Sequence, residues 1–136
     1  MTQRTLVLLK PDTVRRGLVG EVLGRFEAKG LTVVAMELRH IDGELADQHY
    51  AEHVERDFYP PLRAFVTSGP LVSLVLEGDE AIEVVRAING ATDGRRAAPG
   101  TIRGDLSLSN RENLVHGSDS PESAEREIAI WFPGLS

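Results

Sequence analysis

The stretch TLVLLKPD, Thr5–Asp12, joins an unbroken apolar run to a Lys-Pro-Asp corner. A short apolar run that ends in a turn signal favours a buried strand. Proline has no N–H to donate to a neighbouring strand, so the strand has to stop at this corner. The stretch therefore predicts a buried first strand over Thr5–Leu9, around which the remaining elements have to be arranged.

Further segments have the composition of strands: Leu31–Leu38, Leu71–Leu76 and Asn113–Val115. Other segments combine helical spacing with start or stop signals, and these predict helices over Leu18–Lys29, within Ile41–His53, over about Pro60–Thr67, over Glu80–Ile88 and over Ser120–Phe132. We expect N-caps at Asp42, Asp79 and Ser120, and a C-cap at Gly30.

The order of these elements, β-α-β-(αα)-β-α-loop-β-α, is typical of an α+β domain. It predicts a ferredoxin-like (split βαβ) fold, in which helices pack around a four-stranded antiparallel sheet. A doubly wound parallel sheet is the alternative, although such a sheet normally has more strands and glycine-rich turns after them.

Length and composition narrow the class of protein. A chain of 136 residues predicts one domain over residues 1–136, and a net charge of −6 disfavours a nucleic-acid backbone as the main partner. The absence of cysteine excludes disulfides and thiolate zinc sites and is typical of a reducing compartment. The apolar run Leu6–Leu9 is too short for a signal peptide or a membrane span, so we expect a cytoplasmic protein with no membrane partner.

The segment Asn89–Gly104 lacks hydrophobic periodicity and carries four glycines and three arginines. An irregular segment of this length indicates a functional loop or disorder. Basic and hydroxyl side chains in or beside it, together with Lys10 at the end of the first predicted strand, form a candidate phosphate-binding set: Lys10, Arg86, Thr92, Arg95, Arg96, Thr101 and Arg103. No phosphate-wrapping glycine pattern is present, so binding would depend on side chains. A merely solvated loop surface is the alternative.

Lysine is rare in this chain, with Lys10 and Lys29 against 13 arginines. Lys29 precedes Gly30 and suits the last turn of a helix. Lys10 has no such explanation, so we expect a specific need for an ammonium group at that position.

The stretch NLVHGSDSPESAERE, Asn113–Glu127, places His116 between a predicted strand and a helix that Ser120 caps. A neutral imidazole is a nucleophile at physiological pH. If the helix folds back beside the strand, the Glu127 carboxylate would orient the ring. Gly117 would leave room for a phosphate. The alternative is a histidine that is hydrogen-bonded for structure alone.

The stretch HYAEH, residues 49–53, matches the pattern of inverted zinc peptidases. In that pattern two histidines of a helix hold zinc, here His49 and His53, and a glutamate acts as base. A third ligand is hard to place, so an exposed helix surface is the competing interpretation. The neighbouring rings of Phe58 and Tyr59 predict one core aromatic residue and one platform for a base.

Six motifs occur together in an order that is specific to one family: LVLLKPD, HYAEH, TSGP, APGTIRGD, NLVHGSDS and ESAEREIAIWF. On these motifs the chain resembles the nucleoside diphosphate kinases over essentially its whole length. The resemblance implies a phosphotransferase that moves the γ-phosphoryl group of a nucleoside triphosphate, mainly ATP, to nucleoside diphosphates. The exchange would be ping-pong, through a phosphohistidine. An inactive nucleotide-binding or regulatory relative is the alternative.

The resemblance also implies roles for individual residues. His116 matches the phosphorylated histidine, with Nδ1 as the expected atom, and Glu127 matches the acid that supports it. Lys10, Arg86, Thr92 and Arg103 match phosphate-binding positions, Lys10 also lying near the ribose 3′-hydroxyl. Asn113 matches a sugar contact, Tyr50 a residue close to the site, and Phe58 the ring that stacks on the base. Mg²⁺ should arrive on the nucleotide phosphates, so no metal site of the protein's own is expected. A homo-oligomer is expected, a hexamer rather than a tetramer.

The chain departs from the family pattern at several positions. Thr13 stands where glycine is frequent, and Asp57 stands where proline commonly precedes the aromatic ring. Gly94 replaces a usual proline and is expected to loosen the assembly. Asn110 replaces an apolar residue near the base and is expected to alter the base contact.

Overall fold

The chain folds around one antiparallel sheet in a computed structural model that describes residues 1–135. Its strands are β1 (Thr2–Leu9), β2 (Thr32–Arg39), β3 (Leu71–Asp79) and β4 (Val115–Gly117), in the spatial order β2-β3-β1-β4. β1 pairs antiparallel with both β3 and β4 and is therefore a central strand. This order confirms the ferredoxin-like α+β prediction and excludes the parallel alternative.

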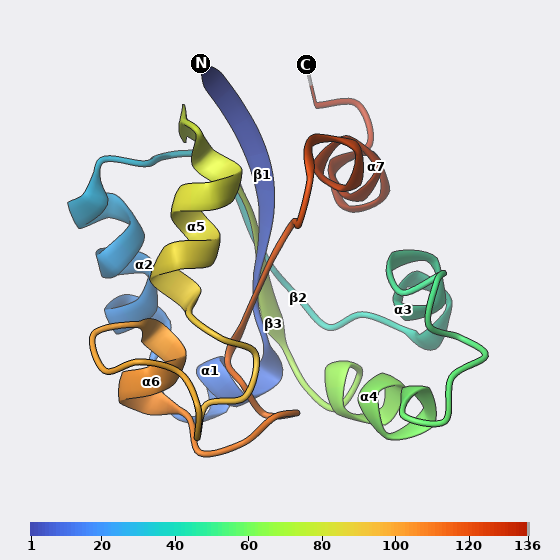
Figure 1. Ribbon diagram of the computed structural model, residues 1–136. Coiled ribbons are helices and arrows are strands. Elements are labelled where there is room, and N and C mark those ends of the chain that lie inside the picture. The colour runs from blue at the N-terminus through green and yellow to red at the C-terminus, as the bar shows by residue number, and fades with distance from the viewer. Residues whose placement is uncertain (136) are drawn as a thin grey trace.

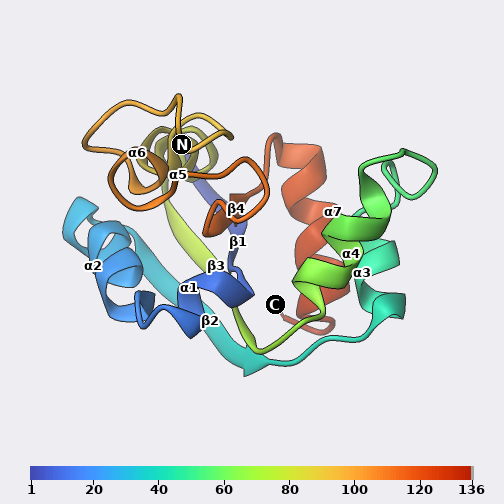
Figure 2. The same ribbon diagram turned by 90° about the horizontal axis from the view of Figure 1, so that it is seen from below.

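Helices cover both faces of the sheet (Figures 1 and 2). One face carries α2 (Val19–Lys29), α5 (Ala81–Asn89) and α6 (Ile102–Leu106). The other face carries α3 (Gly43–His49), α4 (Tyr59–Val66) and α7 (Pro121–Trp131). The short helix α1 (Pro11–Arg15) follows β1 directly. Among residues 1–135, no helix combines the length and the apolar character that crossing a membrane requires.

The apolar run of β1 is unbroken because both of its faces are buried. Val7 and Leu9 belong to the core under α2 and α5, whereas Leu6 and Leu8 belong to the core under α3, α4 and α7. All four side chains are fully buried. Successive side chains of a strand point to opposite faces, so a central strand between two helical layers needs apolar residues at every position.

Most of the predicted caps are present. Ser120 accepts the Ser123 N–H at its Oγ, Asp42 accepts the Leu45 N–H, and Gly30 has φ +106°. The predicted cap at Asp79 is wrong, because Asp79 is the last residue of β3 and Glu80 precedes α5 without a side-chain cap.

The prediction for the fourth strand is displaced along the chain. β4 begins at Val115 rather than at Asn113, because Leu114 has φ +74° and cannot continue a strand. His116 therefore lies inside β4, opposite Leu8 of β1, and not in the turn after the strand. This pairing anchors the histidine to the centre of the sheet.

Short or truncated helices account for the other differences. The helices α1 and α6 were not predicted, since each has five residues and so offers too little apolar periodicity. α6 occupies the end of the segment that was expected to be a loop. α3 ends at His49, before the rest of the HYAEH stretch.

Candidate active site

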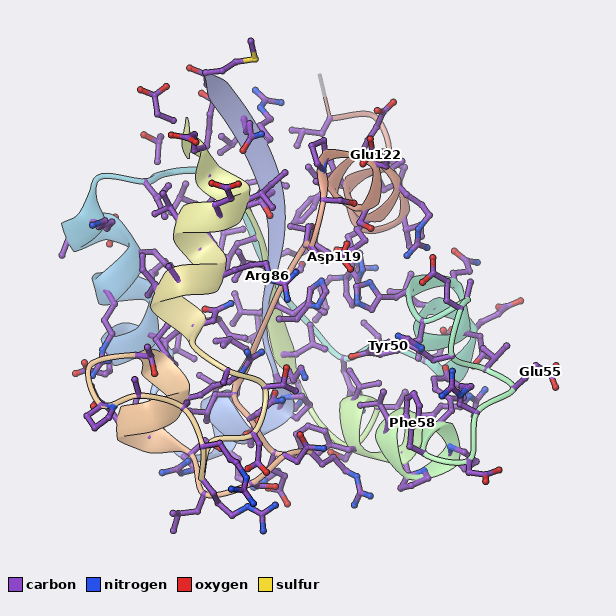
Figure 3. All side chains as sticks on the ribbon, in the orientation of Figure 1. Tyr50, Glu55, Phe58, Arg86, Asp119 and Glu122 are labelled. Carbon is purple, nitrogen blue, oxygen red and sulfur yellow. The ribbon has the colours of Figure 1, made fainter. Side chains whose placement is uncertain are left out.

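An open cleft of about 690 Å³ brings together polar side chains from distant parts of the chain. Every residue to which the family resemblance assigned a catalytic or binding role lines it: Lys10, Tyr50, Phe58, Arg86, Thr92, Arg103, Asn113, His116 and Glu127. In Figure 3, Arg86 belongs to α5, Tyr50 and Phe58 lie on the side of α3 and α4, and Glu55 points away. Arg95 also lines the cleft, although its guanidinium pairs with the Asp93 carboxylate at 2.8 Å; Arg96 and Thr101 are not among the lining residues.

His116 is held by the acid that the sequence paired with it. Its Nε2 lies 2.8 Å from Oε1 of Glu127, whose side chain is 7% exposed. A carboxylate only accepts hydrogen bonds, so Nε2 carries the hydrogen and Nδ1 keeps its lone pair. Within residues 1–135 no hydrogen bond engages Nδ1, and the imidazole is 20% exposed at the cleft wall. The ring therefore presents a free nucleophilic nitrogen.

Ser118 binds the same carboxylate oxygen of Glu127 that engages His116. Its hydroxyl donates to Oε1 of Glu127 at 2.8 Å and accepts the Leu6 N–H at 3.1 Å. The side chain is fully buried. Ser118 was not singled out from the sequence, where it is one of several small polar residues in a predicted turn. It connects Glu127 to the central strand and so limits movement of the carboxylate.

His49 forms a neutral wall beside the nucleophile. Trp131 donates from Nε1 to Nδ1 of His49 at 3.0 Å, and burial lowers the pKa of His49 well below its ordinary value. Its ring meets the His116 ring edge-on, with the centroids 4.7 Å apart. The sequence placed His49 on an exposed helix surface or at a zinc ion, and neither interpretation is correct, since the side chain is 4% exposed and bound to Trp131.

The zinc-peptidase hypothesis fails on geometry. α3 ends at His49, so His53 lies outside the helix, with its ring 5.4 Å from that of Phe58. The two histidines therefore do not share a helix face. A different group, His49, His116 and Glu127, brings possible ligand atoms within 4.8 Å of one another. Trp131 and the His116–Glu127 hydrogen bond already engage that group.

Lys10 lies at the floor of the cleft with only 7% of its surface exposed. Its Nζ donates to Oδ1 of Asn113 at 2.9 Å, and Nδ2 of Asn113 donates to the Thr92 and Asn110 carbonyls. Burial, with a smaller contribution from the Arg103 charge, lowers the pKa of Lys10 to about 8. The ammonium group is therefore poorly hydrated and open to an anion.

Arg103 connects the long segment to β4. Its guanidinium donates to the carbonyls of Gly90, Asn113 and Val115 at 2.8, 3.2 and 2.6 Å. Burial, helped by the nearby Arg86 charge, lowers the pKa of Arg103 to about 10. Arg103 therefore organises the cleft wall and adds positive charge to it.

The backbone makes a tight turn next to the nucleophile. The Val115 N–H donates to the Asn113 carbonyl at 2.8 Å, and Leu114 between them has φ +74°. This combination is a γ-turn of the rare, strained type. Leu114 is fully buried, so a bulky side chain occupies a backbone conformation that favours glycine.

Close packing explains two glycines for which the sequence suggested other roles. A Cβ at Gly117 would lie 2.9 Å from Cγ1 of Val85, so this glycine lets α5 approach β4. Gly117 also lines the cleft, and its role in leaving room for a phosphate stays a prediction. A Cβ at Gly94 would lie 2.4 Å from the Ser107 carbonyl oxygen, and the Gly94 N–H donates to the Ser109 carbonyl. Gly94 is therefore tightly held inside the chain, and its effect on assembly stays a prediction.

Comparison with known proteins finds close similarity over the whole chain. The family model described as nucleoside diphosphate kinase matches residues 3–135. The nucleoside diphosphate kinase of Nocardioides sp. is 78% identical over 135 residues, which are 99% of this chain and 100% of that protein. The nucleoside diphosphate kinase of Cutibacterium acnes is 65% identical over 133 residues, 98% of this chain and 96% of that protein.

Solved structures agree with the sequence comparison. A halophilic nucleoside diphosphate kinase from Halobacterium salinarum, in complex with CDP, superposes with a TM-score of 0.95 at 48% identity. The match covers 98% of this chain and 89% of that one. A nucleoside diphosphate kinase family protein from Babesia bovis superposes with a TM-score of 0.93 at 44% identity, over 96% of this chain and 88% of that one.

Proposed function

This chain belongs to the nucleoside diphosphate kinase family, and on that premise we propose that His116 carries the phosphoryl group in its reaction. The chain has the activity of this family, which is transfer of the γ-phosphoryl group of a nucleoside triphosphate, mainly ATP, to a nucleoside diphosphate. Residues 1–136 act as one nucleoside diphosphate kinase domain.

The single observation that carries the role of His116 is the hydrogen bond from its Nε2 to Glu127. That bond leaves the Nδ1 lone pair free at the cleft, and the negative carboxylate favours the positive charge that develops on the ring during attack. Nδ1 is accordingly the proposed phosphorylation site.

Both half-reactions use the same nitrogen. In the first, the Nδ1 lone pair forms a bond to the γ-phosphorus, the bond to the β–γ bridging oxygen breaks, and the leaving diphosphate keeps that electron pair. In the second, a terminal oxygen of an incoming diphosphate attacks the phosphorus, and the N–P electron pair returns to Nδ1. Positioning and positive charge matter most for such transfers.

The cleft has side chains suited to each part of a nucleotide. Lys10, Arg86 and Arg103 supply positive charge for the phosphates, with the Thr92 hydroxyl as a further donor. Asn113, held by Lys10, would contact the sugar, and Tyr50 would lie close to the reacting phosphoryl group. Phe58 is 46% exposed at the cleft and so offers a ring face to any base.

Mg²⁺ fits this site only as a companion of the nucleotide. The cluster of two imidazoles and one carboxylate is nitrogen-rich, whereas Mg²⁺ prefers oxygen ligands. Phosphate oxygens would hold the ion, and Asp119 at the cleft wall, whose pKa is lowered by hydrogen bonding with Ser123, is an ionised oxygen donor nearby. The ion would neutralise phosphate charge.

We also propose the finer biological setting that the resemblance implies. The chain would work in the cytoplasm as a homo-oligomer, a hexamer rather than a tetramer, with nucleoside tri- and diphosphates as its partners. Sedimentation of the purified protein gives the number of subunits directly.

Incubation with γ-labelled ATP and Mg²⁺, without an acceptor, tests the proposal. We expect a stoichiometric phosphoenzyme that is labile in acid and stable in base, that carries phosphorus on Nδ1 by NMR, and that a nucleoside diphosphate discharges. His116→Ala should carry no label. Lack of label on the wild type would refute the mechanism and favour the inactive alternative. Label that persists on His116→Ala would refute His116 as the phosphorylated residue.

His40→Ala is the matched control for the same experiment. His40 is a histidine outside the cleft lining, and its Nε2 lies 2.9 Å from the Thr67 carbonyl oxygen. This variant should be labelled to the wild-type extent. Loss of label in both variants would indicate a general effect of losing a histidine rather than loss of the nucleophile.

A further inference from the structure

The strained turn at Leu114 is held from outside by the corner that follows β1. The Leu114 N–H donates to Oδ2 of Asp12 at 3.0 Å. The Leu114 carbonyl accepts the Lys10 N–H at 2.8 Å and the Thr13 hydroxyl at 2.6 Å. Both backbone polar groups of the strained residue are thus bound by residues 10–13.

The hydrogen bonds between residues 10–13 and Leu114 are buried away from water. Thr13 and Leu114 are fully buried, and Asp12 is 1% exposed. A strained backbone conformation persists only when its surroundings over-determine it. The two bonds to the carbonyl and the one to the N–H supply that constraint, because each would be lost if Leu114 relaxed to negative φ.

The turn sets the direction of two residues of the site. Asn113 immediately precedes Leu114 and holds Lys10 through its side chain. His116 follows two residues later and pairs with Glu127. A relaxed turn would therefore move a nucleotide contact and the nucleophile together.

We propose that Thr13 is a positioning residue for phosphoryl transfer. Its hydroxyl donates a hydrogen bond to the Leu114 carbonyl and so maintains the strained turn. The turn in its strained form orients Asn113 and His116. The inference rests on the proposed function of His116.

Thr5 makes a matched control possible. Its side chain is also fully buried, in β1 of the same sheet, but its hydroxyl has no hydrogen-bond partner among residues 1–135. Thr5→Val and Thr13→Val make the same chemical change at two buried sites, and only the second removes a bond to the turn. Thr13→Ser retains the hydroxyl and serves as the rescue.

The test compares single-turnover phosphorylation by γ-labelled ATP in the full-length variants, normalised to the folded fraction seen by circular dichroism. We expect Thr13→Val to be about fivefold slower than wild type, the factor that corresponds to one neutral hydrogen bond, and Thr13→Ser to recover to within about twofold. Thr5→Val should match the wild type. Equal rates for wild type and Thr13→Val, an equal loss in Thr5→Val, or no recovery in Thr13→Ser would overturn the proposal.

A second measurement separates the effect of the Thr13–Leu114 hydrogen bond on the position of His116 from its effect on the rate of phosphorylation. In ¹⁵N-histidine NMR without nucleotide, with the His116 signal assigned by His116→Ala, Thr13→Val should add a second His116 environment that Thr5→Val lacks. Unchanged His116 signals in Thr13→Val would contradict the claim that the Thr13–Leu114 hydrogen bond orients His116. If the wild type formed no phosphoenzyme, the function proposed for His116 would fail, while the NMR comparison would still decide the role of Thr13.

Discussion

Replacement of Lys10 by methionine is expected to stabilise the fold while it disables the site. The side chain is 7% exposed, and burial lowers its pKa from the ordinary 10.5 to about 8. The folded state therefore holds the ammonium group against a desolvation penalty that the unfolded chain does not have. Methionine removes the charge and keeps most of the buried volume.

The magnitude follows from that difference in pKa. At 1.36 kcal/mol for each pH unit, the interval between 10.5 and about 8 corresponds to about 3 kcal/mol at pH 7. Loss of the hydrogen bond to Asn113, whose donor is charged, takes back about 2 kcal/mol, so the net gain is roughly 1 kcal/mol. Phosphoenzyme formation should fall by roughly 10²-fold, as expected when a charged donor to the transferred group is removed.

The pH dependence of the free energy of unfolding checks independently that the buried charge of Lys10 destabilises the fold. Below pH 8 both states of the protein hold the proton, and the penalty is complete. Between about 8 and 10.5 the folded state releases the proton while the unfolded state keeps it, so the wild-type free energy of unfolding rises with pH. Lys10→Met lacks that rise. Measurements should stop near pH 9.5, since tyrosines of the unfolded chain titrate at about 10.

Urea unfolding at pH 7, 8 and 9, followed by circular dichroism, measures both quantities, and phosphate labelling measures the activity. Lys29→Met is the matched control, because Lys29 is an exposed residue in the last turn of α2. It should leave labelling intact and change stability by only a few tenths of a kcal/mol. If Lys10→Met proved no more stable than the wild type, or kept the wild-type slope with pH, the reasoning would be wrong.

Three further predictions concern the same site and its supports. The kcat/KM of the wild type should decline above pH 8, where the free enzyme loses the Lys10 charge, and a pH profile of initial rates checks this. Gly94→Ala should cost about 1–3 kcal/mol of unfolding free energy in urea melts, because the added Cβ meets the Ser107 carbonyl oxygen. Gly69→Ala is the control, because Gly69, like Gly94, has no positive φ and no atom lies within 4 Å of its Cβ. Trp131→Phe should cost about 1–3 kcal/mol, since Nδ1 of His49 loses its buried donor; thermal unfolding measures the loss, and an unchanged melting temperature would contradict it.

Local signals explain the parts of the fold that were predictable from the sequence. The apolar run of β1, the cap at Ser120 and the glycine after α2 each depend on a few neighbouring residues. The pairing of His116 with Glu127 was also predictable, because a capped helix that folds back beside a strand brings such residues together. Charge and hydroxyl chemistry also pointed to Lys10, Arg86, Thr92 and Arg103. The resemblance alone supplied Tyr50 and Asn113, and the structure places all of them around one cleft.

Long-range contacts explain what the sequence did not predict. Locally, Leu114 favours an extended backbone, which is why the fourth strand was expected to pass through it. Contacts from residues about 100 positions earlier impose the opposite conformation. Likewise the partner of His49 is Trp131, 82 residues away, so no pattern within HYAEH could distinguish a buried histidine from a zinc ligand.

The contact between the β1 corner and the γ-turn also bears on how the enzyme acquires activity during folding. The hydrogen bonds Lys10–Asn113 and Thr13–Leu114 join residues 103 and 101 positions apart, among the longest chain closures available in this molecule. Closures of that length form slowly compared with helices, whose contacts are local. A chain still emerging from the ribosome has β1 and its corner long before it has β4. Catalytic competence should therefore appear last, and regain of phosphoryl transfer on refolding should lag behind regain of helical signal.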